Sequence, residues 1–444
     1  MGRRSVGMRL GMRDGGKSVK RQVLIVGGGA SGLMAGICCA REGASVTILE
    51  HMDRVGKKIL STGNGRCNMT NLTMRPECYR SSQKQFPMKV LDRFSVWDTL
   101  TFFDELGIET KNRNGYIYPN SDQASSVLDA LRMEIEHLGV RVVTNCQIQG
   151  LRAKGRRQFE TKTDVGTFQA DRLILATGSR AMPVSGSDGS GYTLAKSFGH
   201  HIIKPLPALV QLRCEGKFFK QLAGVRCDAV LRIKNSQGRV LAADQGEIQL
   251  TDYGISGIPT FQVSRYASVA LDQKEKVTAV LDFLPSKSMK EILPFLRNRA
   301  KLLSYRKAED YLTGLLNKKL GTVILKLAGI PADLLVSQIR SAQLERLGHL
   351  LKEFEVPVTA ANAFEQAQIC CGGVDTREVH AETLESKLVP GLYLIGELLD
   401  VDGICGGYNL QWAWATGAIA GRCAGREEES MPRCEKTGPV KNKK

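Results

Sequence analysis

Residues 22–36 read QVLIVGGGASGLMAG, and this stretch decides the fold. Its first five residues form a short, continuous apolar run that ends in glycines, which is typical of a strand buried in a parallel sheet. Residues 30–42 then have the composition of a helix, and a second apolar run at 45–49 ends at Glu50. A strand, a glycine turn, a helix and a strand within about thirty residues predict a βαβ unit.

The turn of this unit fits the GxGxxG pattern of dinucleotide-binding proteins. In that pattern Gly27 permits the tight turn, Gly29 lets the backbone approach a pyrophosphate, and Gly32 lets the helix pack closely on the strand. Glu50 ends the second strand, where a carboxylate can hold ribose hydroxyls. The alternative is a glycine turn that serves packing alone. The full context of strand, turn, helix and terminal acid favours a dinucleotide site.

Three later stretches favour FAD over NAD as the bound dinucleotide. Residues 173–178 read LILATG, an apolar strand that ends in Ala-Thr-Gly, as found where a second strand crosses a flavin domain. Residues 392–402 read LYLIGELLDVD, an apolar strand that ends in Gly-Glu and further acids. Residues 406–410 read GGYNL and lead into a helix whose N-terminus can face a flavin ring. Each stretch alone fits an ordinary strand end or turn, but their order along the chain favours FAD.

The rest of the chain predicts a domain that is interrupted by insertions. From about residue 205 the pattern changes to short alternating strands, which are typical of an antiparallel barrel or sandwich. Residues 286–352 then show apolar residues at helical spacing. We predict an α/β fold in which a Rossmann-type FAD-binding domain is split by a β-barrel insert that carries a small helical domain. The predicted parts are a disordered basic leader (1–20), the FAD-binding domain (21–203 and 355–425), a β-rich insert (204–285), a helical insert (286–354) and a flexible tail (426–444).

The charge of the chain raises the question of an anionic partner. The 444 residues include 62 Lys and Arg and 45 Asp and Glu, so the formal net charge is +17. The first twenty residues contribute +5 and residues 286–352 contribute +8. Clusters of this kind attract nucleic acid or anionic ligands, whereas the alternative is a solvated helical face with a basic tail. We expect a small anionic substrate, and the scarcity of aromatic residues in the basic segments makes nucleic acid unlikely.

Composition and cysteine usage limit the class of protein. With 42% hydrophobic and 24% charged residues, the sequence excludes wholesale disorder and a polytopic membrane protein. The 12 cysteines show no zinc spacing and no CxxC pair, so we expect neither a metal site nor a disulfide framework. Reduced thiols favour a cytoplasmic protein. No apolar run is long enough to span a membrane, and the basic N-terminus lacks the apolar region of a signal peptide.

Five stretches resemble one flavoprotein family. They are IVGGGASGLMAG (25–36), GKKILSTGNGRCNMTN (56–71), GSDGSGYTLAKSFGH (186–200), GEIQLTDYGISGIP (246–259) and VPGLYLIGELLDVDGICGGYNLQWAWATG (389–417). On these motifs the chain is similar to the HI0933-like, or aminoacetone-oxidase-like, FAD-binding proteins, from about residue 20 to 425. The resemblance implies a two-dinucleotide-binding-like FAD domain, split by a β-barrel and a small helical domain. This agrees with the pattern of predicted elements.

The resemblance also implies which residues bind the cofactor. On the pyrophosphate and adenosine side it implies Gly27, Gly29, Ala30, Ser31, Gly32, Glu50 and Ile148. On the loop after the second strand it implies Lys57, Lys58, Asn64, Gly65, Arg66 and Asn68. On the later strands and the last helix it implies Thr177, Gly178, Gly396, Glu397, Asp400, Asp402, Asn409 and Leu410. The alternatives are a solvated loop for the basic residues and turn chemistry for the asparagines.

Three reactions remain open for such a flavoprotein, because the flavin supplies the hydride chemistry and the protein supplies position and electrostatics. The first is reduction of a C=C bond conjugated to a carbonyl, with NADH or NADPH as reductant. For this reaction the resemblance implies an unsaturated 3-oxo bile acid, a steroid acid or its CoA ester as a candidate substrate. The second is oxidation of an amine with O2, and the third is an RNA-binding flavoprotein.

Three residues are candidates for the catalytic chemistry of the reductase. Tyr253 and Tyr408 are candidate proton donors or carbonyl-polarising groups. Cys405 is predicted to lie near the flavin, where a thiol has a redox or proton-donating role, although related sequences often have a polar residue there. Each of the three fits a packing role as well, since tyrosine and free cysteine are common in cores.

Overall fold

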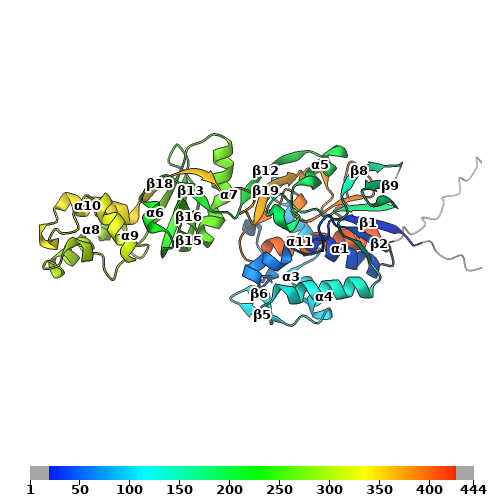
Figure 1. Ribbon diagram of the computed structural model, residues 1–444, viewed down its shortest axis with the longest axis horizontal. Helices are drawn as coiled ribbons and strands as arrows, with labels where there is room; N and C mark the ends of the chain where they lie inside the picture. The colour runs from blue at the N-terminus through cyan, green and yellow to red at the C-terminus, as the bar shows by residue number, and fades with distance from the viewer. Residues whose placement is uncertain (1–19, 156, 427–444) are drawn as a thin grey trace, which may run out of the picture.

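The computed structural model describes residues 20–155 and 157–426, which form three parts arranged in a row (Figure 1). A large α/β domain lies at one end, a barrel of strands in the middle and a small group of helices at the other end. The predicted leader and tail lie outside the described residues, apart from Lys20 and Arg426. Among the residues that the structure describes, no helix is both long and apolar enough to cross a bilayer.

A five-stranded parallel sheet forms the centre of the large domain. Its order is β20-β11-β1-β2-β7, and Ile25 of the middle strand pairs with both Ile48 and Ile174. The strands are continuous apolar runs because both faces of the sheet are covered by other elements. They are β1 (Gln22–Val26), β2 (Ser45–Leu49), β7 (Arg141–Val143), β11 (Arg172–Leu175) and β20 (Leu392–Leu394).

Helices and small sheets surround this parallel sheet. The helices are α1 (Ala30–Arg41), α2 (Phe86–Leu91), α3 (Val96–Glu105), α4 (Ala124–His137), α5 (Ser190–Ser197) and α11 (Tyr408–Gly425). One small sheet has the order β3-β6-β5, another has the order β10-β9-β8, and β4 pairs with β21. Their strands are β3 (Thr70–Asn71), β4 (Tyr79–Arg80), β5 (Thr110–Arg113), β6 (Tyr116–Pro119), β8 (Ile148–Ala153), β9 (Phe159–Thr163), β10 (Gly166–Ala170) and β21 (Asp402–Gly403).

The first and last helices of the large domain pack closely against each other. Gly417, Gly421 and Gly425 follow one another at intervals of four residues on α11, so they share one face of the helix. A methyl group added at Gly421 would lie 2.6 Å from the carbonyl oxygen of Ala35 on α1. The other two glycines approach backbone oxygens of α1 at 2.5 and 2.8 Å in the same way. This glycine stripe lets the two helix backbones come into direct contact.

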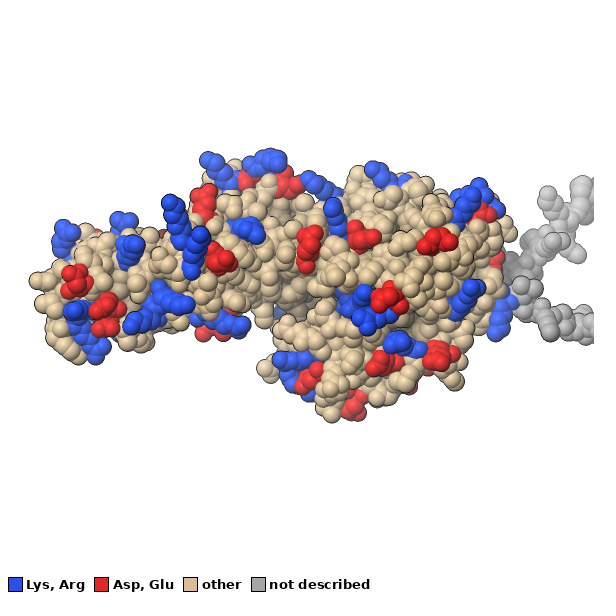
Figure 2. Space-filling view, viewed as in Figure 1, with Lys and Arg blue, Asp and Glu red and all other residues tan. Residues whose placement is uncertain are grey.

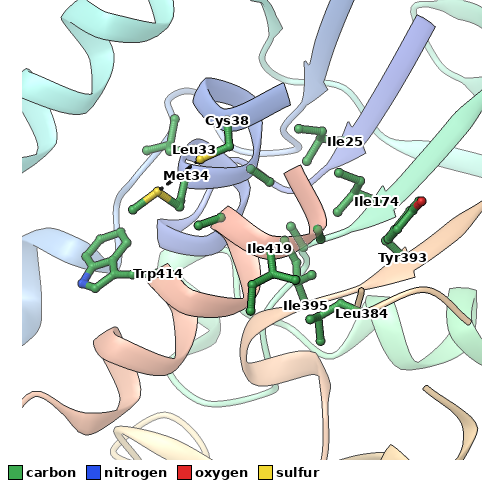
Figure 3. Close-up of a cluster of buried hydrophobic side chains, with 14 of the residues drawn as sticks. Ile25, Leu33, Met34, Cys38, Ile174, Leu384, Tyr393, Ile395, Trp414 and Ile419 are labelled. Atoms are coloured by element: carbon green, nitrogen blue, oxygen red, sulfur yellow. Dashed lines mark hydrogen bonds between the residues drawn. The ribbon is translucent and has the colours of Figure 1, made fainter. Parts of the chain in front are cut away.

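The main hydrophobic core lies where these two helices meet the parallel sheet. Figure 3 shows Leu33 and Met34 of α1, Ile419 of α11 and Ile174 of β11 directed into this cluster. All four side chains are at most 5% exposed. The core therefore fixes α1 and α11 relative to the ends of the strands, which is where a bound dinucleotide is expected.

A pair of strands connects the large domain to the barrel. β12 (Ile202–Ala208) and β19 (Ile369–Val374) run antiparallel and lie between the two parts (Figure 1). The barrel is closed in the order β13-β16-β15-β14-β17-β18. It consists of β13 (Leu212–Cys214), β14 (Arg226–Lys234), β15 (Val240–Leu250), β16 (Gly254–Ser256), β17 (Val277–Asp282) and β18 (Phe354–Ala361), with α6 (Phe219–Leu222) and α7 (Ile258–Asp272).

The strand β18 corrects one predicted boundary. The sequence places residues 355–425 in the FAD-binding domain, whereas β18 pairs with β17 and with β13 and so closes the barrel. The hydrogen-bonding partners of this strand lie far away in the sequence, so the local pattern gives no sign of them. The return to the large domain therefore comes after Ala361.

The helical part contains α8 (Met289–Leu302), α9 (Lys318–Leu327) and α10 (Ser341–Lys352) and rests on one end of the barrel. The buried ammonium group of Lys352 joins the two parts, because it lies 2.7 Å from a carboxylate oxygen of Asp282 and 2.8 Å from the carbonyl oxygen of Leu284. On the face seen in Figure 2, Lys and Arg side chains are scattered over these helices with Asp and Glu among them. This distribution agrees with a solvated helical face.

Candidate functional site

A cavity of about 930 Å³ is lined by the large domain, the connecting strands and α7. The strands β1, β2 and β11 end at this cavity, and Gly27, Glu50 and Thr177 follow them on its wall. In open α/β sheets, ligands bind beyond the carboxyl ends of the strands. The position of the cavity therefore agrees with the dinucleotide site that the sequence predicts.

In the turn between β1 and α1, an added methyl group would meet different surroundings at each glycine. Gly27 has φ +101°, and an added methyl group would lie 2.5 Å from the carbonyl oxygen of Ala176. At Gly32 the methyl group would lie only 1.9 Å from the carbonyl oxygen of Gly27. At Gly29, in contrast, it would meet no atom within 4 Å, and this residue lines the cavity. Gly29 therefore keeps open a space that a ligand can fill.

Two helices begin at the cavity wall. Gly29 is the N-cap of α1 and Gly407 is the N-cap of α11, and a glycine in this position has no side chain that could accept a hydrogen bond from the first N–H groups. The free N–H groups and the positive end of each helix dipole favour an anion or a carbonyl oxygen. The side chain of Asn409 braces the start of α11, since it accepts a hydrogen bond from the Gly403 N–H at 2.8 Å. The cavity thus offers two electropositive helix ends.

Glu50 holds the glycine turn in place. Its carboxylate accepts hydrogen bonds from the N–H groups of Gly28 at 2.8 Å and Met52 at 2.9 Å. The residue is 9% exposed, and it lines the cavity. A carboxylate has about four lone-pair sites, so Glu50 can accept hydrogen bonds from ribose hydroxyls as well. The turn and the acid therefore form one unit.

An ion pair connects the loop after β2 with the short helical turn Gly396–Leu398 that comes after β20. The ammonium group of Lys58 lies 2.6 Å from a carboxylate oxygen of Glu397, and Ser179 donates a hydrogen bond to the same oxygen at 3.0 Å. Lys58 and Glu397 both line the cavity and are mostly buried. Residues that are 339 positions apart in the chain thus form one polar group on the cavity wall.

The residues on the wall fit FAD. The hydroxyl oxygen of Thr177 is buried and has no hydrogen-bond partner among the described residues, although Thr177 lines the cavity. The open space at Gly29 and the two helix starts with glycine N-caps suit the same ligand. The first turn of α1 would hold the pyrophosphate, Glu50 the adenosine ribose, and the first turn of α11 the pyrimidine edge of the flavin.

Most of the cofactor-binding residues predicted from the sequence lie on this one wall. They are Gly27, Gly29, Ala30, Ser31, Glu50, Lys57, Lys58, Asn64, Arg66, Asn68, Ile148, Thr177, Gly178, Glu397, Asn409 and Leu410. Gly32, Gly65, Gly396, Asp400 and Asp402 do not line it. Gly32 and Gly396 lie behind the cavity wall, where each packs against the backbone or a side chain of the β1–α1 unit.

The two aspartates are a correction to the prediction. Asp400 accepts a hydrogen bond from the Ser82 N–H at 2.8 Å, and Asp402 forms an ion pair with Arg265 at 2.7 Å. Both carboxylates are 2% exposed, and burial raises their pKa values, to about 6 for Asp402 in spite of Arg265. An acid at a strand end often binds a ribityl or ribose group, but here the Asp402 carboxylate binds Arg265 of the barrel part and the Asp400 carboxylate binds the Ser82 N–H.

The structure places neither candidate tyrosine on the cavity wall, which corrects the predicted proton donors. The Tyr253 hydroxyl accepts a hydrogen bond from Asn362 at 3.0 Å, and its ring lies under the Arg213 guanidinium. Tyr408 is 5% exposed and packs edge-on against Tyr79.

Cys405 does line the cavity, but burial raises the pKa of its thiol to about 12, so the thiol is neutral at physiological pH.

Two other tyrosines and an apolar wall were missed by the sequence reasoning. Tyr116 and Tyr118 of β6 line the cavity, and burial raises the pKa of Tyr118. The alternation of YIYP at 116–119, which directs both tyrosines to one face of a strand, was the available signal. The apolar wall comes from the connecting strands, α7 and the loop before α11. Its residues are Leu209, Ile258, Phe261, Ile369 and Ile404.

The chain is similar to one protein family and to several known proteins. The model of the HI0933-like protein Rossmann domain matches residues 21–423. A 3-dehydro-bile acid delta(4,6)-reductase of Clostridium scindens is 47% identical over 405 residues, which are 90% of this chain and 98% of that protein. A ribosomal RNA dihydrouridine synthase of Haemophilus influenzae is 30% identical over 400 residues, which are 88% of this chain and 96% of that protein.

One solved structure, a 3-ketosteroid delta1-dehydrogenase from Sterolibacterium denitrificans, is 10% identical, with a TM-score of 0.48, and covers 91% of this chain and 100% of that chain. The predicted α/β fold with a barrel insert is confirmed, and FAD is the cofactor that the fold and the family support. Because the family model matches residues 21–423 of the 444, from β1 into α11, the chain belongs to the HI0933-like family of Rossmann-domain proteins.

Proposed function

We propose that the chain is an FAD-dependent reductase that saturates C=C bonds conjugated to a carbonyl group, with a 3-oxo bile acid as substrate and NADH or NADPH as reductant. The observation that carries the proposal is the 47% identity to a 3-dehydro-bile acid delta(4,6)-reductase over nearly the full length of both chains. The substrate named there has a flat apolar ring system, a polar oxo group and an anionic side chain. Free acid and CoA ester are both compatible with this chemistry.

The cavity has an apolar wall and a positively charged wall, and both suit this substrate class. Leu209, Phe261 and Ile369 form an apolar side against which a steroid ring can pack. Arg66 lines the same cavity and supplies positive charge for an anionic side chain, whereas Arg113 beside it is in an ion pair with Asp122 at 2.7 Å. Bound FAD supplies the hydride chemistry. The chain itself therefore has to bind the substrate, orient it and deliver a proton.

The hydroxyl groups of Tyr116 and Tyr118 are the proposed proton donors or carbonyl-polarising groups. Both residues line the cavity, and the raised pKa of Tyr118 keeps its hydroxyl protonated at neutral pH. Addition of a hydride equivalent to one carbon of the double bond requires a proton at the other carbon. A phenol in this position can either give that proton or donate a hydrogen bond to the carbonyl oxygen.

The proposal is tested with the purified yellow holoprotein under anaerobic conditions. A 3-oxo-4,6-diene bile acid is incubated with NADH or NADPH, and the product is identified by mass spectrometry as the substrate plus one pair of hydrogens for each double bond. Tyr118→Phe should lower turnover roughly 10²-fold or more, with FAD content unchanged. If neither nicotinamide bleaches the flavin absorbance, the proposed reductant is wrong. Rapid turnover of an amine in air would favour the oxidase instead.

A second candidate is reduction of a uracil ring in ribosomal RNA. It is supported by the 30% identity to a ribosomal RNA dihydrouridine synthase over nearly the full length of that protein. The chemistry is related, because the C=C bond of uracil is also conjugated to a carbonyl. The basic helical part, with net charge +8 over residues 286–352, supplies the positive charge that RNA binding needs.

The two candidates are separated by the substrate that the holoprotein reduces. Ribosomal RNA from a strain that lacks the modification is incubated under the same conditions and digested to nucleosides. Dihydrouridine in the digest, together with salt-dependent RNA binding that weakens in Arg297→Ala and Arg299→Ala, would favour the second candidate. Turnover of the bile acid alone would favour the first.

A further inference from the structure

Helix α7 belongs to the barrel part but forms one wall of the cavity. Its first turn contributes Ile258 and Phe261 to that wall, and Ile258 is 63% exposed. In Figure 1 the helix lies between the barrel and the connecting strands β12 and β19. Ser268 of α7 donates a hydrogen bond to the Pro207 carbonyl oxygen at 2.7 Å, and Ser264 accepts one from the Val210 N–H at 3.2 Å. These bonds attach α7 to the connecting strand.

A second set of contacts attaches α7 to the loop that ends at α11. The Arg265 guanidinium lies 2.7 and 2.9 Å from the two carboxylate oxygens of Asp402. One turn earlier, Gln262 accepts a hydrogen bond from the Cys405 N–H at 3.0 Å. Ile404 and Cys405 line the cavity together with Phe261. The same face of α7 therefore contacts both the cavity and the loop at the start of α11.

The environment of this ion pair indicates a positional role. Asp402 is 2% exposed, and the Arg265 side chain is 21% exposed. Replacement of a buried ion pair by apolar groups is often neutral for stability, because the desolvation of both charges offsets their attraction. The partners come from two different parts of the fold, 137 positions apart. The ion pair instead provides a directional contact that fixes the barrel part against the large domain.

We propose that Arg265 is a positioning residue that sets the apolar wall of α7 against the loop 402–407 and thereby fixes the width of the substrate cavity. We expect FAD to stay bound without Arg265, because the glycine turn and Glu50, which would hold its pyrophosphate and adenosine side, lie on the large domain alone. The identity of the substrate rests on the proposed function, but the contact between α7 and the loop does not. Loss of apolar contact in a binding pocket weakens substrate binding roughly tenfold to two-hundredfold.

The test compares Arg265→Met with Arg265→Lys and with a matched control. The control is Arg226→Met, which removes an exposed ion pair with Glu247 on the same barrel, at 2.9 Å. Hydrogen exchange of the holoprotein is measured for peptides that cover residues 402–407 and the first turn of α7. Steady-state kinetics with the 3-oxo-4,6-diene bile acid separate KM from kcat, and FAD content reports folding.

We expect Arg265→Met to retain FAD, to exchange faster in the loop 402–407 and to raise KM about tenfold to a hundredfold with a smaller change in kcat. Arg265→Lys should restore most of the KM, and Arg226→Met should behave as the parent protein. Unchanged exchange and unchanged KM in Arg265→Met would overturn the proposal, as would equal loss of FAD and activity in Arg265→Met and in the conservative Asp402→Asn. If the parent protein does not reduce the bile acid, the proposed function fails, whereas the exchange data still decide the role of Arg265.

Discussion

Gly29 and Gly32 are three residues apart, yet an added methyl group meets opposite surroundings at each. At Gly32 it would overlap the carbonyl oxygen of Gly27, whereas at Gly29 it would extend into the cavity. The first glycine of this pair is therefore needed for the ligand and the second for the fold. Sequence reasoning identified both because the whole GxGxxG motif is local in the chain.

The two glycines give a paired prediction. Gly29→Ala should lower the free energy of unfolding of the apoprotein by no more than about 1 kcal/mol, because alanine is a poorer N-cap than glycine but is allowed at φ −77°. Its FAD affinity should fall roughly tenfold or more, which corresponds to about 1.4 kcal/mol. Gly32→Ala should destabilise the apoprotein by about 1–3 kcal/mol or more. Urea unfolding of both apoproteins and FAD titration measure the difference, and equal effects on stability would contradict it.

Cys405 gives a second prediction at this scale. Because burial raises the pKa of its thiol to about 12, less than about one thiol in a thousand is ionised at pH 8. Cys405→Ala should keep FAD and reduce turnover only a few-fold, and iodoacetamide should modify Cys405 slowly at pH 8. Tyr118→Phe serves as the comparison, since it should lose turnover under the same conditions. Fast alkylation, or a loss in Cys405→Ala as large as in Tyr118→Phe, would restore a catalytic role for the thiol.

The elements of the βαβ unit were predictable because their signals are local. The expected strand at 22–26, helix at 30–42 and strand at 45–49 agree with β1, α1 and β2 to within one residue. The ribbon of β5 and β6 was not predicted, and neither was α7, so the residues that they add to the cavity were missed as well. The sequence predicts Asp402 at the cofactor because the true partner of its carboxylate, Arg265, is 137 residues away and leaves no local pattern.

The contact between α1 and α11 gives a prediction at the scale of elements. Gly421→Ala should destabilise the protein by about 1–3 kcal/mol or more, because the new methyl group lies 2.6 Å from a backbone oxygen of α1. Gly348→Ala on α10 is the matched control. There the methyl group would contact Ile292 at an ordinary 3.4 Å, so helix propensity should leave stability unchanged or raise it by up to about 1 kcal/mol. Denaturant unfolding of both variants measures this difference, and similar values would contradict close helix packing.

On the scale of the whole molecule, the large domain and the barrel part meet at the buried carboxyl group of Asp402, whose pKa differs between the folded and the unfolded state. Burial raises the pKa of Asp402 from its ordinary value of 3.8 to about 6, and Arg265, Arg80, Asp400 and Cys371 are the groups that face it. The folded state thus holds this proton more tightly than the unfolded state does. The resulting stability is fully present below pH 3.8 and is lost as the pH rises through 6.

Asp402→Asn removes this titration and gives the corresponding prediction. From pH 4 to pH 7 the parent protein should lose stability relative to Asp402→Asn, so the difference in Tm between the two should shift in favour of the variant as the pH rises. Thermal unfolding at several pH values checks this. A difference that is independent of pH would show that Asp402 does not titrate in this range.

The close packing of α1 on α11 also has a consequence for the order of events during synthesis. During translation the N-terminus of α1 (residues 29–31) leaves the ribosome early. The N-terminus of α11 (residues 407–409) follows only after the barrel and the helical part have been made. A nascent chain therefore carries half of a FAD site for most of its translation. Loading of the cofactor becomes one of the last steps of maturation, and a truncated chain that lacks α11 should accumulate as colourless protein even when flavin is abundant.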